Sequence, residues 1–168
     1  LLADQILKIW VKTNMHLGEA IVVIPNWFQL LFVENNGAAF GMQINTSGAI
    51  DWGKLLLSLF RVVMIGALGY YIYYLTRKRK DMPKGAIIGL AMILAGAVGN
   101  LIDRAVLGFV VDMFRTLFMH FPVFNVADIF LCVGVGMMML YILVMEPKIE
   151  KAKKEAAKDG DHLSDGNA

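Results

Sequence analysis

Residues 84–104 read KGAIIGLAMILAGAVGNLIDR, a run that stays apolar after its opening lysine until its last turn. A helix of about 20 residues crosses the hydrocarbon core of a bilayer, and this run has that length. Two further runs match it. Residues 54–75 (KLLLSLFRVVMIGALGYYIYYL) are broken only by Arg61, and residues 125–145 (NVADIFLCVGVGMMMLYILVM) carry Asp128 near their start. These three runs predict transmembrane helices.

The composition of the whole chain supports the same interpretation. Hydrophobic residues make up 58% of the 168 residues and charged residues only 18%, whereas a soluble domain carries about 25% charged residues. A small globule buries the smallest fraction of its surface, so it could not hide this much apolar surface from water. A lipid environment removes that conflict. The sequence therefore predicts an all-α integral membrane protein.

The opening stretch LLADQILKIWV is apolar but short, and it already contains Asp4 and Lys8. We interpret residues 1–14 as the outer end of a first span whose beginning is absent from this sequence. A secretory signal peptide would place its positive charge before the apolar core and end in small residues, and this stretch does neither. Four spans are therefore expected.

The distribution of Lys and Arg predicts the orientation. Four of the sixteen basic residues lie between the second and third spans, a fifth, Lys84, opens the third span, and five follow the last span. Residues 15–53 contain none, and residues 105–123 contain only Arg115. By the positive-inside rule the two basic segments are cytoplasmic, and residues 15–53 and 105–123 lie outside. Topology explains the basic clusters, so no nucleic-acid partner is expected. Residues 1–146 form one membrane domain in this interpretation, and residues 147–168 form a charged cytoplasmic tail.

The outer segment after the first span differs in composition from the spans. AIVVIPNWFQLLFVENNGAAFGM is rich in β-branched and aromatic residues, with turn signals at Pro25-Asn26 and at residues 35–37. This composition is typical of short strands joined by turns. We expect a small sheet on the outer surface of the membrane.

Small residues and the single cysteine are interpreted as packing features. Residues 84–104 carry Gly and Ala at spacings of four, which allows neighbouring helices to approach closely. Cys132 lies in an apolar run and is expected to be a small buried residue. The three histidines show no metal-ligand spacing, so neither a metal nor a cofactor is expected.

Ionisable and amide side chains at the outer ends of the spans need an explanation. An ionisable side chain well inside a span costs roughly 2.5–3.5 kcal/mol. Some members of this set have a structural explanation, because Asp4 and Lys8 have the spacing of a helical ion pair and Asn125 could cap a helix that has Asp128 in its first turn. The set comprises Asp4, Lys8, Asn100, Asp103, Arg104, Asp112, Asn125 and Asp128.

Asp112 favours a functional explanation. It lies in the apolar stretch GFVVDMF, and its nearest cation in the sequence is Arg115. Two aspartates in a low-dielectric site share a proton, so one can act as general base on water while the other donates a hydrogen bond to a scissile carbonyl. Pairing Asp112 with Asp128 would give this aspartic-protease arrangement. A non-enzymatic transporter or bundle subunit is the alternative, although transporters place such residues near the bilayer midplane.

Five blocks of sequence carry a family resemblance. In order they are DQILK (4–8), VENNGAAFG (33–41), GNLIDR (99–104), GFVVDMF (108–114) and FNVAD (124–128). They resemble the motifs DQxxK, NxGAAF, GNxxDR, GxVxDF and FNxAD of the lipoprotein signal peptidases, the type II signal peptidases of bacteria. Met113 interrupts the Asp-Phe pair of the fourth motif. The blocks cover nearly the whole chain except the tail.

The resemblance implies four transmembrane helices, a small extracytoplasmic β-sheet cradle, and an outer loop or short helix over the site. It implies an aspartic endopeptidase of the bacterial cytoplasmic (inner) membrane, expected to be a monomer, with its site at the extracytoplasmic face. The enzyme would remove signal peptides from diacylglyceryl-modified prolipoproteins by cutting before the lipidated cysteine. Its expected partners are these prolipoproteins, membrane lipids and the inhibitors globomycin and myxovirescin. By motif Asp112 and Asp128 are catalytic, with support from Asp4, Lys8, Asn35, Gly37, Asn100, Arg104, Asn125 and Ala127.

Overall fold

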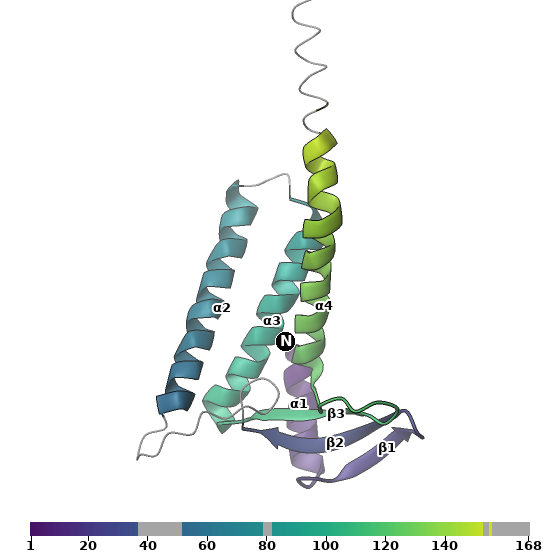
Figure 1. The fold of residues 1–168 in the computed structure, drawn as a ribbon. Helices are drawn as coiled ribbons and strands as arrows, with labels where there is room; N and C mark the ends of the chain where they lie inside the picture. Colours follow the sequence, from purple (N-terminus) through teal and green to yellow (C-terminus); the bar gives the residue numbers. More distant parts are fainter. Residues whose placement is uncertain (37–51, 79–81, 153–154, 156–168) are drawn as a thin grey trace, which may run out of the picture.

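The computed structural model describes residues 1–36, 52–78, 82–152 and 155. In Figure 1, α3 and α4 run side by side, α2 stands beyond α3, and a small sheet crosses one end of the helices next to α1. The elements are α1 (Leu2–Asn14), β1 (Ala20–Ile24), β2 (Phe28–Asn35), α2 (Trp52–Lys78), α3 (Lys84–Leu107), β3 (Val110–Thr116) and α4 (Val126–Leu140), which a π-helical turn, η2 (Tyr141–Met145), continues.

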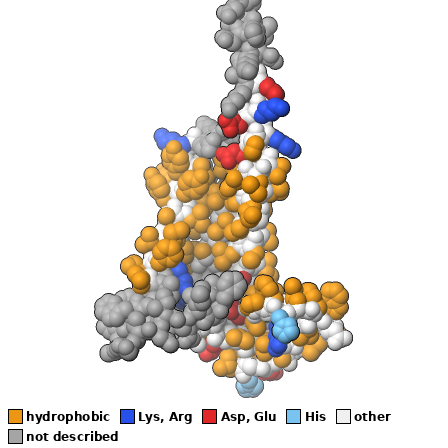
Figure 2. Space-filling view, viewed as in Figure 1, with side chains coloured by type: hydrophobic (Ala, Val, Ile, Leu, Met, Phe, Trp, Pro, Cys, Tyr) orange, Lys and Arg blue, Asp and Glu red, His pale blue; other side chains and the backbone are white. Residues whose placement is uncertain are grey.

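Among the described residues, three helices are long and apolar enough to cross a membrane, and they include most of each of the three predicted spans. They are Ser58–Lys78, Lys84–Leu107 and Val126–Ala152. Hydrophobic side chains cover much of their visible surface (Figure 2), as expected where the solvent is lipid. Helix α1 has 13 residues, which is shorter than a span, so the fourth span stays a prediction. Cys132 is exposed on α4, so its interpretation as a buried residue was wrong; its side chain lies on the surface of the bundle.

Close contact between α3 and α4 depends on glycine. A Cβ atom at Gly96 would lie only 2.4 Å from the backbone oxygen of Ala127. One at Gly134 would lie 2.6 Å from the backbone oxygen of Gly89. Backbone atoms cannot rotate away as a side chain can, so any larger residue would push the helices apart. Gly89 and Gly96 are therefore packing residues, as predicted for the small residues of α3, whereas Gly85 has open space around it.

The sheet is antiparallel, with strand order β1-β2-β3. The turn between β1 and β2 contains Asn26 at φ 61°, a left-handed conformation that Asn tolerates well, and it lies at the predicted Pro25-Asn26 signal. The third strand was not predicted. Helix α3 ends at Gly108, whose φ of 83° reverses the chain, and β3 starts two residues later.

The core beneath the sheet joins it to α1. It consists of Val11 and Met15 at the end of α1, Phe32 of β2, and Val111 and Met113 of β3, all of them buried. Burial of Val, Phe and Met side chains stabilises a fold by about 1.5–3 kcal/mol each. This core fixes the height of β3 against the helices, and therefore the position of Asp112, which lies between the two core residues of that strand.

Candidate active site

Asp112 is a buried carboxylate on β3, and its side chain is only 3% exposed. Its two oxygens accept hydrogen bonds from amide groups, Oδ2 from Asn35 Nδ2 at 3.0 Å and Oδ1 from Asn125 Nδ2 at 2.7 Å. Asn35 pairs with Val110 across the strands, two residues before Asp112. It therefore lies on the same face of the sheet as a diagonal neighbour, within reach of Asp112.

The surroundings of Asp112 raise its pKa from 3.8 to about 6. Burial makes the largest contribution, because the charged form loses its hydration. The negative charge of Asp128 raises the pKa further, while the hydrogen bonds from Asn35 and Asn125 lower it. The negative charge of Asp128 therefore acts on Asp112, and Asp112 holds its proton more tightly than an exposed aspartate does.

Asp128 lies in the first turn of α4, where a capping box holds it. The Asn125 side chain accepts a hydrogen bond from the Asp128 backbone N–H at 3.0 Å, and Asp128 Oδ2 accepts one from the Asn125 backbone N–H at 3.0 Å. Such a box satisfies backbone donors that the helix leaves free. The structural role expected for these residues is thus confirmed. The second oxygen, Oδ1, accepts a hydrogen bond from Asn100 Nδ2 at 2.8 Å.

Two amide side chains connect the two aspartates. Asn125 Nδ2 donates both to Asp112 Oδ1 and, at 3.1 Å, to Asn100 Oδ1. Asn100 donates in turn to Asp128. The resulting chain of hydrogen bonds runs from Asp112 through Asn125 and Asn100 to Asp128. At each step an amide NH₂ group donates and an oxygen accepts, and these roles cannot be exchanged. The structure therefore brings together residues from β3, α3 and α4 that are up to 28 positions apart.

A buried ammonium group lies behind this chain. Lys8, only 3% exposed, forms ion pairs with Asp4 Oδ2 and Asp103 Oδ2, both at 3.0 Å. Its Nζ also donates to Asn100 Oδ1 at 3.1 Å. Because an ammonium group can only donate, it fixes the Asn100 oxygen toward itself and leaves the NH₂ group directed at Asp128. The predicted pair of Asp4 and Lys8 is confirmed.

The carboxylates around Lys8 also hold the backbone next to the site. Asp4 Oδ1 accepts the Ala127 backbone N–H at 2.8 Å, and Asp103 Oδ2 accepts the Val111 backbone N–H at 3.1 Å. Val111 precedes Asp112 and Ala127 precedes Asp128, so α1 and α3 hold the backbone just before both aspartates. Gly99 permits this approach, because a Cβ atom there would lie 2.8 Å from Asp4 Oδ2.

Two members of the polar network were not among the predicted site residues. Gln5 Nε2 donates to Asp103 Oδ1 at 3.0 Å and to the Gly99 backbone oxygen at 3.2 Å, and Asp103 pairs with Lys8. Both residues lie inside the sequence blocks that carry the family resemblance, and their place in those blocks is the signal that could have identified them as site residues. Arg104 is half-buried and within electrostatic range of both Asp112 and Asp128. Gly37 and the predicted loop or short helix over the site lie outside the described residues.

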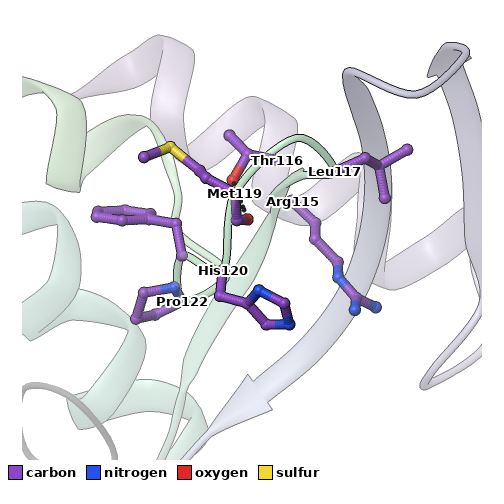
Figure 3. Close-up of a pocket in the computed structure, with 7 residues that line it drawn as sticks. Arg115, Thr116, Leu117, Met119, His120 and Pro122 are labelled. Carbon is purple, nitrogen blue, oxygen red and sulfur yellow. Dashed lines mark hydrogen bonds between the residues drawn. The ribbon is translucent and has the colours of Figure 1, made fainter.

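A separate pocket opens in the loop after β3. It has a volume of about 380 Å³ and is lined by Arg115, Thr116, Leu117, Met119, His120, Phe121 and Pro122. Figure 3 shows the Arg115 and His120 side chains beside the short turn that the hydrogen bond from Thr116 Oγ1 to the Met119 backbone oxygen closes. Neither aspartate lines it, so we place the candidate site at the hydrogen-bonded carboxylates.

These features define a class of integral membrane protein with a polar site at one end of its bundle. Its helices are long enough to cross a membrane, a sheet covers one end of them, and two carboxylates joined through hydrogen bonds lie where the helices and the sheet meet. Comparison with known proteins makes this more specific. Residues 1–144 match the family described as signal peptidase (SPase) II. The chain belongs to this family, and it is a membrane peptidase.

Individual relatives and solved structures agree. A lipoprotein signal peptidase of Lactococcus lactis subsp. lactis (strain IL1403) is 40% identical over 151 residues, which cover 90% of this chain and 91% of the relative. One from Clostridioides difficile (strain 630) is 41% identical, covering 86% and 90%. Two solved bacterial membrane enzymes are similar in fold. One is 30% identical with a TM-score of 0.70, covering 84% of this chain and 81% of that structure. The other is 29% identical with a TM-score of 0.71, covering 86% and 87%.

Proposed function

We propose that this peptidase removes the signal peptide from diacylglyceryl-modified prolipoproteins, with Asp112 and Asp128 as its catalytic dyad. The observation that supports the dyad most strongly is the hydrogen-bonded chain that links the two carboxylates through Asn125 and Asn100. The relatives named lipoprotein signal peptidase support the substrate class. The cut falls immediately before the lipidated cysteine in this proposal.

The proposed mechanism uses the proton that the aspartates share. One carboxylate accepts a proton from a water molecule, whose oxygen attacks the scissile carbonyl carbon. The other carboxyl group donates a hydrogen bond to the carbonyl oxygen as it gains negative charge. The C–N bond then breaks, and the amine leaves with a proton. The raised pKa of Asp112, about 6, supports this assignment because it keeps a protonated carboxyl available near neutral pH.

Asn100 and Asn125 hold the dyad in position in this proposal. The three hydrogen bonds that their NH₂ groups donate orient both carboxylates before substrate arrives, so little reorganisation is needed during the reaction. Lys8 supports them from behind by fixing the orientation of Asn100. Asn35 donates to Asp112 from the sheet, and Arg104 lies within electrostatic range of both aspartates. These residues are positioning residues.

The site is proposed to face the outside of the bacterial cytoplasmic membrane. The sheet and both aspartates lie at one end of the bundle, whereas α2 ends at Lys78 and α3 begins at Lys84 at the other (Figure 1). Basic residues favour the cytoplasmic side. We further propose that α1 is part of a fourth span, that residues 1–146 act as one monomeric domain with a cytoplasmic tail from residue 147, and that globomycin and myxovirescin inhibit the enzyme.

The dyad is tested with purified protein and a lipidated prolipoprotein. Asp112→Asn and Asp128→Asn should each reduce cleavage by at least about 1,000-fold, since each removes an acid–base group that acts only in the transition state. Glu34→Gln is the matched control. Glu34 pairs with Val111, the neighbour of Asp112 on β3, and successive side chains of a strand alternate between faces, so Glu34 projects from the face of the sheet opposite to that of Asp112. Near-normal cleavage by either Asp variant would refute the dyad. Loss of cleavage in all three variants would point to general damage instead.

A further inference from the structure

A row of aromatic side chains lies on the face of the sheet that carries Asp112, and the proposed mechanism does not use it. Alternate side chains of a strand share a face, so Phe114 points to the same side of β3 as Asp112. Phe124 lies opposite Phe114 in an isolated β-bridge, and Phe28 pairs with Thr116, the next residue of β3 on that face. Directly paired residues share a face as well, so these three phenylalanines are neighbours there.

The rings of these phenylalanines lie side by side. The ring of Phe114 lies 5.5 Å from that of Phe28 and 5.7 Å from that of Phe124, measured between centroids. Phe121 continues the series, because its ring centroid lies 5.7 Å from that of Phe124. We call Phe28, Phe114, Phe121 and Phe124 the aromatic row.

The aromatic row begins beside the proposed dyad and leads away from it. Phe114 follows Asp112 by two residues, a separation of about 7 Å along a strand. Phe124 directly precedes the capping box of α4. Phe28 lies opposite the last residue of β3, so the row runs toward the outer end of the sheet. Phe121, in the loop after β3, is 50% exposed, and the far end of the row is therefore open.

The face of the sheet that carries the aromatic row is directed toward the membrane helices. Asp112 on this face accepts a hydrogen bond from Asn125 at the start of α4, whereas Val111 and Met113 on the opposite face pack against the end of α1. The sheet extends sideways beyond α4 (Figure 1), and hydrophobic side chains lie along the helix side of this extension (Figure 2). Because α3 and α4 are membrane-length helices, the row faces the lipid leaflet next to the site.

The proposed substrate needs an apolar path of this kind. Cleavage immediately before the lipidated cysteine makes the cysteine nitrogen the leaving amine, and the sulfur that carries the diacylglyceryl group is only a few covalent bonds away from it. The glycerol therefore lies close to the dyad, and its acyl chains have to return from there to the bilayer. The signal peptide on the other side of the cut has an apolar segment of its own, which occupies a separate path.

We propose that the aromatic row binds the acyl chains of the substrate's diacylglyceryl group and guides them from the dyad to the outer leaflet. The proposal rests on the proposed function, because that function supplies the lipidated cysteine. Rings that are partly exposed without substrate become covered by acyl chains when it binds, and burial of apolar surface favours binding. The aromatic row thus contributes to specificity: it favours a cysteine that carries long acyl chains over one that does not.

The test compares two synthetic prolipoprotein peptides of the same sequence in uncharged detergent micelles. The diacylglyceryl group carries palmitoyl chains in one peptide and butyryl chains in the other, and both peptides enter the micelle through the same signal-peptide segment. We expect the full chain to cleave the palmitoyl peptide with a kcat/KM about tenfold higher or more. Phe121→Ala should lower kcat/KM for the palmitoyl peptide about fivefold, mainly by raising KM, since it removes surface that the chains would cover. It should change cleavage of the butyryl peptide less than about twofold, and Phe121→Leu should keep part of the preference.

Phe118→Ala is the matched control. Phe118 belongs to the same loop and is 57% exposed, but its ring packs on Trp27, at 5.0 Å between centroids, and not on the aromatic row. Its substitution should leave the preference for palmitoyl chains unchanged. An equal loss of palmitoyl cleavage in Phe118→Ala and Phe121→Ala would refute the proposal, because this end of the sheet would then contact the bilayer in general.

Two further outcomes would also overturn the proposal. One is equal kcat/KM of the unmodified chain for the two peptides, and the other is an equal loss for both peptides in Phe121→Ala, which would indicate a structural role. The butyryl peptide thus serves as the folding control for each variant. Absence of cleavage of both peptides by the unmodified chain is a distinct result, since it would refute the proposed function and the acyl-chain site with it.

Discussion

Replacing Lys8 by Met should strongly destabilise the protein, because it leaves two buried carboxylates without their common cation. Asp4 is 0% exposed and Asp103 is 3% exposed, and each lies 3.0 Å from the Lys8 ammonium group. With Lys8 the three charges sum to −1, and without it they sum to −2 in the same volume. Removing one partner of a buried ion pair costs about 3–5 kcal/mol. For a chain of this length each kcal/mol shifts Tm by about 2–4 °C, so Tm should fall by about 6–20 °C.

Thermal unfolding in detergent micelles, followed by tryptophan fluorescence, measures this effect. Lys12→Met is the matched control, because Lys12 lies one turn further along the same helix, is exposed, and has its ammonium group over the Phe109 ring, 5.0 Å from the ring centroid. Its Tm should change little. The double variant Lys8→Met with Asp103→Asn should recover part of the loss, since one of the two unpaired carboxylates is then neutral. Equal Tm values for Lys8→Met and Lys12→Met would refute the reasoning.

Two further predictions concern helix packing and pH. Gly96→Ala should lower stability by about 1–3 kcal/mol in thermal unfolding, because its Cβ would lie 2.4 Å from the Ala127 backbone oxygen. Gly85 has open space around it, so Gly85→Ala should raise the free energy of unfolding by up to about 1 kcal/mol. Equal changes in stability for the two variants would contradict this account. The pH profile of kcat/KM should fall above the pKa of Asp112, about 6, as the shared proton is lost. Asn35→Ala removes a hydrogen bond that stabilises the charged carboxylate, so it should raise that pKa and move the fall by about one pH unit upward; a downward shift would contradict it.

The spans could be predicted from the sequence because lipid imposes a length and an apolar composition that local sequence displays directly. The capping box at Asn125 and the ion pair of Asp4 with Lys8 were also visible, since both depend on residues three or four positions apart. Strand β3 was not predicted. Its residues Val110 to Met113 are all buried, so the alternation of apolar and polar residues that marks a half-buried strand is missing.

The connections within the site could be anticipated only in part. That Asp112 and Asp128 lie at the same end of the bundle followed from topology. The role of Asn100 as a link between Asn125, Lys8 and Asp128 depends on the close packing of α3 with α4 and α1, which no local pattern encodes. Asp103 was noticed as a charge in a span but not as a partner of Lys8, because its partner lies 95 positions away in the sequence.

The hydrogen bond from the Ala127 backbone N–H to Asp4 joins residues 123 positions apart, and this has a consequence for the biogenesis of the protein. A nascent chain that has been synthesised only as far as β3 contains Asp112 but neither Asn125 nor Asp128. The proposed dyad is complete only once α4 has been synthesised and its first turn has docked against α1. If the dyad carries the catalysis, we expect a chain that lacks α4 to be inactive, so that cleavage begins only after the last membrane helix is in place.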